Sequence, residues 1–287
     1  MKIINIFFVI ALGSYFLTLH TSCEEVGPPI SFNAADTTLL DTTYMLGGGE
    51  IPVPQTKIVL LEDFTGQECP NCPDAHEIIA DISAEHPGQL CVIAYYNYFA
   101  DIFGGLPLVS DDAIDIGENF SATESWPAAL IDRKDFEGDG EPLLDKNDYA
   151  ASVDEQVSEI PSCNISIEKA YDETTRKLTV KITIIYTSAA LALNHLSVAL
   201  IENNIIAEQL DGLTEITDYI HNNVMRKFLT YYLGDGLSEI NSAGRVYEKE
   251  FAYIIPAEWN ADNIEIVAFV HHAEADNYRV LQAAFLE

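Results

Sequence analysis

Cys69 and Cys72 belong to the motif CPNCP (residues 69–73), in which two residues separate the two thiols. An apolar run at 58–61 precedes the motif, and residues 74–82 after it have helical spacing. A strand, a short turn and a helix that opens on C-x-x-C form the context in which this motif performs thiol–disulfide exchange. The free N–H groups and partial positive charge of a helix N-terminus favour the thiolate at Cys69. We therefore predict a redox site.

Two other roles for this cysteine pair have to be weighed. A structural zinc site needs four ligands, usually from two such pairs, and the sequence contains no second C-x-x-C. We therefore expect no metal and no cofactor. A purely structural disulfide stays open, because such bridges persist in exported proteins.

The chain has two further cysteines beyond residue 73. Cys91 lies in the apolar, strand-like run LCVIA and is expected to be a buried small hydrophobe. Cys163 follows Pro161 and Ser162 at an expected domain junction. A bridge between Cys91 and Cys163 would be possible in an oxidising compartment, but its geometry cannot be judged from sequence.

The N-terminus has the pattern of a secretory signal. Residues 1–22 contain Lys2 near the start, an apolar run to Leu19 and two small residues directly before Cys23. This arrangement resembles a bacterial lipoprotein signal, which implies that Cys23 is lipidated and becomes the mature N-terminus. A membrane-spanning anchor is disfavoured, because the run is short and acidic residues follow it in place of a Lys/Arg cluster. The lipid would then be the membrane contact, with the folded part in water.

The chain is strongly acidic. Its formal net charge at pH 7 is −32, and 48% of its residues are hydrophobic. Such a charge repels nucleic acid and anionic membrane surfaces, so no nucleic-acid partner is expected. The apolar fraction is that of an ordinary folded protein.

The sequence after the signal divides into three segments. Residues 23–55 are rich in Gly, Pro, Thr and Asp without a sustained period, so we expect a flexible tether. Residues 56–160 alternate between strand-like and helix-like patterns, which is typical of an α/β domain. Residues 161–287 change to a period of two, which predicts an all-β, sandwich-like domain.

The expected elements follow from these periods. In the α/β segment we expect strands at 57–64, 89–97 and 128–132. We expect helices at 70–84 and 146–159, and between them a loop with a short helix that ends near residue 120. In the β segment we expect strands at 164–170, 178–184, 196–202, 246–254, 264–271 and 278–286. The long insert 203–244 is expected to be partly helical at 219–233. For His221, with Arg226 nearby, a solvated loop is favoured over a place in the lining of a surface groove.

Residues 62–132 resemble a thioredoxin-fold domain. The motifs that carry the resemblance are DF at 63–64, CPNC at 69–72, and WPA at 126–128 before an apolar run. In that superfamily a cis-proline precedes a central strand and packs against the C-x-x-C, and Pro127 is placed for that role. The whole chain resembles outer-membrane lipoproteins of the Omp type, in which a thioredoxin-like domain precedes a β-rich domain. Further motifs for this second resemblance are FTG at 64–66, HNNV at 221–224 and VLQAA at 280–284.

The resemblance implies roles for the residues of the motif. Cys69 would be the exposed attacking thiol and Cys72 the buried resolving thiol, while Asp63 matches the buried acid that takes the proton of the resolving cysteine. The implied substrate groove consists of Trp126, Pro70 and Asn71, beside Pro127. Two departures are the dipeptide Pro-Asn in place of Gly-Pro, and Glu68 in place of an aromatic residue. A carboxylate next to Cys69 raises the pKa of its thiol and so opposes the helix end.

Two functions follow from these residues. The first is a lipid-anchored thiol–disulfide oxidoreductase whose partners are the thiols or disulfides of envelope proteins. The second is a surface lipoprotein that is not an enzyme, with the thioredoxin fold as a scaffold, a static Cys69–Cys72 bridge and a β-domain that binds a partner.

Overall fold

Strand β2 (Val59–Thr65) is the buried centre of the segment that carries the C-x-x-C motif. All seven of its residues are buried, because neighbouring strands flank it and helices cover it. Strand β3 (Leu90–Tyr96) runs parallel to β2, and β4 (Ala128–Ile131) runs antiparallel to its other edge. These strands lie where the sequence predicts them. The computed structural model describes residues 39–48, 50–97, 108–123, 125–190, 193–237, 241–274 and 277–286.

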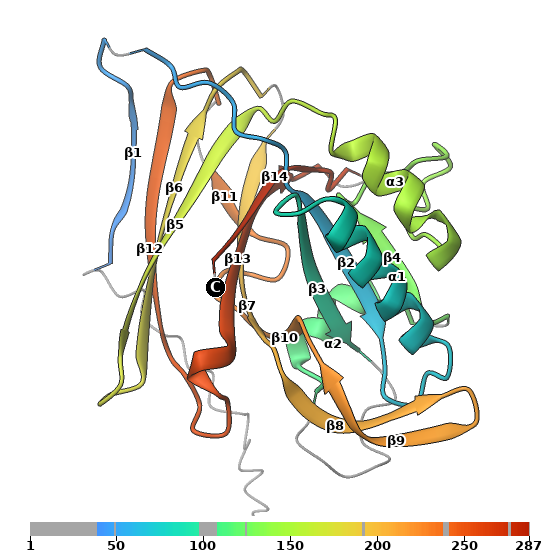
Figure 1. Ribbon diagram of the computed structural model, residues 1–287. Coiled ribbons are helices and arrows are strands. Elements are labelled where there is room, and N and C mark those ends of the chain that lie inside the picture. The colour runs from blue at the N-terminus through green and yellow to red at the C-terminus, as the bar shows by residue number, and fades with distance from the viewer. Residues whose placement is uncertain are drawn as a thin grey trace, which may run out of the picture. The chain divides into compact units, whose positions relative to one another are not determined.

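Helices cover both faces of this part of the sheet (Figure 1). Helices α1 (Cys72–Glu85) and α3 (Tyr149–Gln156) pack against the face that includes Val59 and Leu61. Helix α2 (Asp111–Asn119) packs on the other face, against Leu60 and Phe64. Neighbouring strand residues point to opposite faces, so the apolar residues of this buried strand contribute to two separate cores. A short 3-10 turn, η1 (Lys146–Asp148), leads into α3.

Helix α1 begins at Cys72 and not at residue 70, so this expected boundary was wrong. Cys69 precedes Pro70, and a residue before proline is disfavoured in the α conformation. Pro73 is favoured in the first turn of the helix because its missing N–H has no partner to lose there. Cys69 therefore lies in the turn before the helix, and Cys72 lies at its first position.

The remaining strands make the molecule rich in β-structure. A four-stranded antiparallel sheet has the order β1-β12-β6-β5, formed by Asp41–Met45, Arg245–Ile254, Lys177–Tyr186 and Cys163–Asp172. Strand β6 alternates between buried and partly exposed residues, as its period of two predicts. Strand β1 lies inside the segment expected to be a tether, so that expectation was wrong for these five residues.

A mixed eight-stranded sheet carries the rest of the fold, in the order β14-β13-β7-β10-β3-β2-β4, with β11 paired to β7. The strands not yet given are β7 (Asn194–Glu202), β10 (Val224–Phe228), β11 (Asp235–Leu237), β13 (Ile264–His272) and β14 (Val280–Leu286). Strand β10 runs antiparallel to β7 and parallel to β3. The eight-stranded sheet thus contains strands from both sides of residue 160, and the division into two domains at this residue stays a prediction.

The two large sheets share a hydrophobic core. Val180, Ile182 and Ile184 of β6 are fully buried in the same cluster as Val198 of β7 and Ala268 of β13. A turn, η2 (Ala261–Asn263), precedes β13. The buried residues of the alternating strands in 161–287 therefore form this core.

The insert 203–244 differs from its prediction. Residues 219–233 contain no helix; instead, strands β8 (Ile205–Asp211) and β9 (Thr214–His221) form a two-stranded sheet of their own, and β10 follows. Gly212 has a positive φ of 57° in the connection between β8 and β9. Asp-Gly is a strong hairpin signal, because glycine adopts this conformation without steric cost. The tight turn therefore decides between helix and hairpin here.

Candidate functional site

A disulfide joins Cys69 and Cys72 at the start of α1. Cys72 is completely buried and Cys69 is only 7% exposed, whereas Pro70 and Asn71 between them are exposed. The expectation of an exposed Cys69 was therefore wrong for this oxidised state. Asn71 is the N-cap residue of α1, but its side chain makes no capping hydrogen bond.

The other two described cysteines are free and buried, so the conceivable Cys91–Cys163 bridge does not form. Burial raises the pKa of the Cys163 thiol to about 12 and raises that of Cys91 further. Thiols with such pKa values are protonated at neutral pH and are poor nucleophiles. Reactive sulfur in the described part of the chain is therefore confined to Cys69 and Cys72.

Trp126 and Pro127 lead directly into β4, and the peptide bond between them is cis. Strand β4 pairs with β2, with Ala128 opposite Phe64. The indole Nε1 of Trp126 donates a hydrogen bond to Asn97 Oδ1 at 2.9 Å, just beyond the end of β3. This bond connects the segment before β4 to the residue that follows the carboxyl end of β3.

Asp63 lies on β2 and is 1% exposed. Neither carboxylate oxygen has a hydrogen-bond partner among the described residues, and His76 Nε2 lies 3.4 Å from Oδ2. The same Nε2 lies 3.0 Å from Thr65 Oγ1, and His76 Nδ1 lies 2.8 Å from the hydroxyl of Tyr219. Helix α1 thus places an imidazole between a buried carboxylate and the β8–β9 hairpin.

A second histidine–tyrosine pair lies beside the first. The hydroxyl of Tyr96 is 2.8 Å from His221 Nδ1, and the rings of Tyr219 and His221 are 4.9 Å apart. Burial lowers the pKa of His221 to about 4 and raises the pKa of Tyr219 to about 12. Both groups are therefore uncharged at neutral pH, and the expectation of His221 in a solvated loop was wrong.

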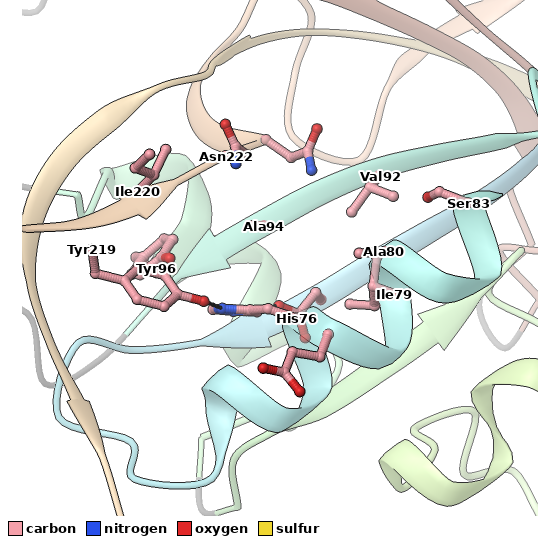
Figure 2. A pocket seen from close by; sticks show the side chains of 13 residues that line it. His76, Ile79, Ala80, Ser83, Val92, Ala94, Tyr96, Tyr219, Ile220 and Asn222 are labelled. Carbon is pink, nitrogen blue, oxygen red and sulfur yellow. Dashed lines mark hydrogen bonds and ion pairs between the residues drawn. The ribbon is translucent and has the colours of Figure 1, made fainter. Parts of the chain in front are cut away.

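These side chains border a pocket of about 280 Å³ between α1 and the end of β9. Figure 2 shows His76, Tyr96 and Tyr219 gathered at one end of it, with Ile79 and Ala80 of α1 along one wall. Asp63 and the residues 222–223 also belong to the lining. The pocket therefore reaches the buried carboxylate of Asp63.

Three residues of this region were missed in the sequence: His76, Tyr219 and Gln209 of β8, whose Nε2 contacts the carbonyls of Gly66 and Cys69. His76 is only an ordinary polar position in the helical pattern, and its role depends on residues far away along the chain. The signal that could have located the other two is the Asp211-Gly212 pair, which predicts a hairpin between two short strand-like runs.

A family model described as "Outer membrane protein Omp28" matches residues 117–285, more than half of the chain. The chain belongs to the Omp28 family. Membership places this Omp28-family protein at the outer membrane. The matched region begins after the C-x-x-C motif, so the family match does not bear on Cys69 and Cys72.

Two solved structures share the fold of this Omp28-family protein. HBP35 of Porphyromonas gingivalis is 16% identical with a TM-score of 0.64, covering 82% of this chain and 76% of that one. A protein of Agrobacterium tumefaciens is 13% identical with a TM-score of 0.53, covering 81% of this chain and 95% of that one. No curated protein matches the sequence. Among the described residues, none of the helices has the length and apolar character needed to cross a membrane.

Proposed function

We propose that this protein is a lipid-anchored thiol–disulfide oxidoreductase of the outer membrane, with Cys69 and Cys72 as its redox centre. The observation that carries the proposal is the Cys69–Cys72 disulfide at the first turn of α1, between the parallel strands β2 and β3. A strand–helix–strand unit with this motif at the helix start is the usual setting of thiol–disulfide chemistry.

The arrangement of strands supports a thioredoxin-like assignment for residues 56–160. Strands β3, β2 and β4 are adjacent in that order, and β4 alone is antiparallel to β2. Leu144 pairs with Ala129 on the outer edge of β4, and α3 follows. Pro127 immediately precedes β4, which is the position that the resemblance requires.

The proposed reaction needs only the two thiols and a substrate disulfide. The Cys69 thiolate attacks one sulfur of the substrate, which forms a mixed disulfide and releases the other substrate sulfur as a thiolate. Cys72 then loses its proton to Asp63, attacks the Cys69 sulfur and releases the second substrate thiolate. The substrate is reduced by two electrons and the Cys69–Cys72 bond is formed. The reverse sequence oxidises a substrate dithiol.

Burial of both sulfurs favours a second candidate function. Cys72 is fully buried and Cys69 nearly so, which is the environment of a static disulfide in an exported protein. In this alternative, the segment 56–160 is a scaffold and the β-rich segment 161–287 binds a partner.

A redox titration of the purified chain in glutathione buffers distinguishes the two functions. Thioredoxin-fold catalysts have reduction potentials between about −270 and −120 mV, whereas structural disulfides in secreted proteins lie below about −300 mV. A potential in the catalytic range supports the oxidoreductase, and a bridge that resists reduction supports the scaffold.

Trapping in cells tests the same proposal with the natural partners. Cys72→Ala should accumulate mixed disulfides between Cys69 and envelope proteins, because the resolving thiol is absent. The double variant Cys69→Ala/Cys72→Ala is the matched control. Equal amounts of cross-linked species in both variants would contradict the proposal.

Lipidation of Cys23 is a further part of the proposal. It is supported by the signal-like residues 1–22, which lie outside the described residues. Metabolic labelling with a fatty-acid probe should label the natural chain and not Cys23→Ala. Equal labelling of both chains would show that the anchor lies elsewhere.

A further inference from the structure

The hairpin β8–β9 stands apart from both large sheets. Its two strands pair only with each other among the described strands, and it runs beside the first turn of α1 (Figure 1). Since it does not belong to the larger ladders, its contacts with the loop that carries Cys69 help to hold it in place, beside the contacts of Tyr219 with His76 and of His221 with Tyr96.

The backbone of β8 and of the turn that follows it is hydrogen-bonded to that loop on both sides of Cys69. The amide of Leu210 donates to Gln67 O at 2.8 Å, and the amide of Gly212 donates to Pro70 O at 2.9 Å. The side-chain Nε2 of Gln67 donates to Glu208 O at 2.8 Å. The loop is thus held along β8 almost as an additional short strand.

The buried side chain of Gln209 adds further hydrogen bonds between β8 and the loop. A register shift in the β8–β9 pairing lies between Ala207 and Gln209, and the Gln209 side chain is fully buried. Its Nε2 lies 3.2 Å from Gly66 O and 3.3 Å from Cys69 O, and also contacts Leu210 O at 3.0 Å. Its Oε1 is buried with no hydrogen-bond partner among the described residues.

This arrangement is unusual for a residue that only stabilises a hairpin. A buried glutamine with an unpaired oxygen is unfavourable, and such exceptions call for an explanation. Here the amide nitrogen is shared between the carbonyl of Leu210 and the carbonyls of Gly66 and Cys69 in the loop, and Cys69 is only 7% exposed. A thiol partner needs access to a sulfur before exchange can occur.

We propose that hairpin β8–β9 caps the Cys69–Cys72 disulfide and that Gln209 is the positioning residue that holds the cap closed. The inference rests on the oxidoreductase function proposed above. A protein partner must displace the hairpin before its thiolate can attack the Cys69 sulfur. That attack forms the mixed disulfide, breaks the Cys69–Cys72 bond and releases Cys72 as a thiolate.

Reduction of the full chain by dithiothreitol tests the cap without a natural partner. One dithiothreitol thiolate attacks Cys69, and its second thiol then releases the reduced protein with cyclic oxidised dithiothreitol. Gln209→Met keeps the size of the side chain but removes the amide donors, so the reduction rate should rise by about tenfold or more. Leu213→Ser, at a fully exposed site in the turn of the same hairpin, should leave the rate within about twofold.

The buried thiols of Cys91 and Cys163 report global opening in the same samples. In Gln209→Met they should remain as resistant to iodoacetamide as in the natural chain, because only the hairpin is released. Equal reduction rates in the natural chain and Gln209→Met would overturn the proposal. Faster reduction accompanied by equally faster alkylation of Cys91 and Cys163 would also overturn it, since global unfolding would then be the cause.

Hydrogen exchange of the oxidised protein supplies a readout that a general loss of stability would not give. The amides of Leu210 and Gly212, which donate to the loop, should exchange faster in Gln209→Met while those of β2 stay protected. If the cap behaves as proposed but Cys72→Ala traps no partner, the oxidoreductase function is wrong. The hairpin then covers a structural disulfide.

Discussion

At the scale of the residue, the reactivity of the cysteines is set by burial and by the charges around each thiol. Cys69 lies in the turn before α1 and not within it. The partial positive charge at the helix N-terminus still favours a thiolate there, but from outside the helix. Glu68 next to it is partly exposed, and its carboxylate disfavours a thiolate at Cys69. Cys72 is covered on all sides.

We expect iodoacetamide at neutral pH to modify reduced Cys69 well before Cys72. Cys69 is the more accessible thiol, and Cys91 and Cys163 should remain unmodified because burial raises their pKa values. Glu68→Gln should speed the modification of Cys69 by about two- to tenfold, since it removes one adjacent negative charge. Mass spectrometry of peptides from a time course checks both expectations.

The matched control for this experiment is Glu77→Gln, an exposed change on α1. It should leave the order and the rates unchanged. Modification of Cys72 ahead of Cys69 would contradict the assignment of the attacking thiol.

At the scale of the element, the hairpin β8–β9 is joined to the rest of the fold by its histidine and tyrosine. Tyr219 contacts His76 of α1, and His221 contacts Tyr96 of β3. The remaining nitrogen of His221, Nε2, is buried without a hydrogen-bond partner among the described residues. A proton on this ring would therefore be poorly solvated.

We expect His221 to make the fold sensitive to acid. Its pKa is lowered from 6.5 to about 4 by burial, so between these values the unfolded chain binds a proton that the folded chain does not. The contribution of His221 to stability is therefore complete above pH 6.5 and is lost progressively as the pH falls towards 4.

Urea unfolding of the natural chain and His221→Gln at several pH values measures this effect. The difference in free energy of unfolding between the two chains should change by about 1–3 kcal/mol across the window, in the direction of a less stable natural chain at low pH. The carboxylates titrate in both chains and cancel. A difference that does not depend on pH would show that folded His221 retains its ordinary pKa.

At the scale of the whole molecule, the eight-stranded sheet connects the two segments that sequence analysis separates at residue 160. A buried ion pair reinforces this connection: Arg133 Nε and Nη2 donate to Glu62 at 2.6 and 2.7 Å. The guanidinium of Arg133 also lies 5.0 Å from the ring centroids of Phe120 and of Phe269 in β13. Residues from both segments therefore surround one charge pair.

We expect the described part of the chain to unfold in a single transition. The chain has two tryptophans, Trp126 before residue 160 and Trp259 after it, so Trp126→Phe and Trp259→Phe each leave one fluorescent reporter. Within each variant, fluorescence and far-UV circular dichroism should give the same urea midpoint. Separate transitions would instead support two independently folding domains.

Arg133→Met should destabilise the folded state by about 3–5 kcal/mol, because it leaves the buried carboxylate of Glu62 without its cationic partner. Lys146→Ala, which removes an ion pair with the largely exposed Asp74, should hardly change it. The free energies of unfolding in urea give the comparison. Similar effects of the two changes would show that Glu62 finds another partner or becomes protonated.

Local patterns in the chain are enough to predict most strands and helices and the position of the C-x-x-C motif. Strands β5 and β6 and the helix after the motif could be found because period, proline and turn residues act over a few neighbouring positions. The same short-range signals indicate Pro127 before β4. Even the missed hairpin had its local signal in Asp211-Gly212.

The burial and protonation of the site residues depend on contacts between segments far apart in the sequence, which local patterns do not predict. Gln209 reaches the carbonyl of Cys69 across 140 residues, and Tyr219 reaches His76 across 143. Strand β10 lies between β3 and β7 in the eight-stranded sheet, and its pairing with β3 also joins residues far apart in the sequence. Burial of Cys69, the neutral His221 and the unpaired carboxylate of Asp63 are consequences of these contacts, because burial and desolvation arise only when distant segments pack together.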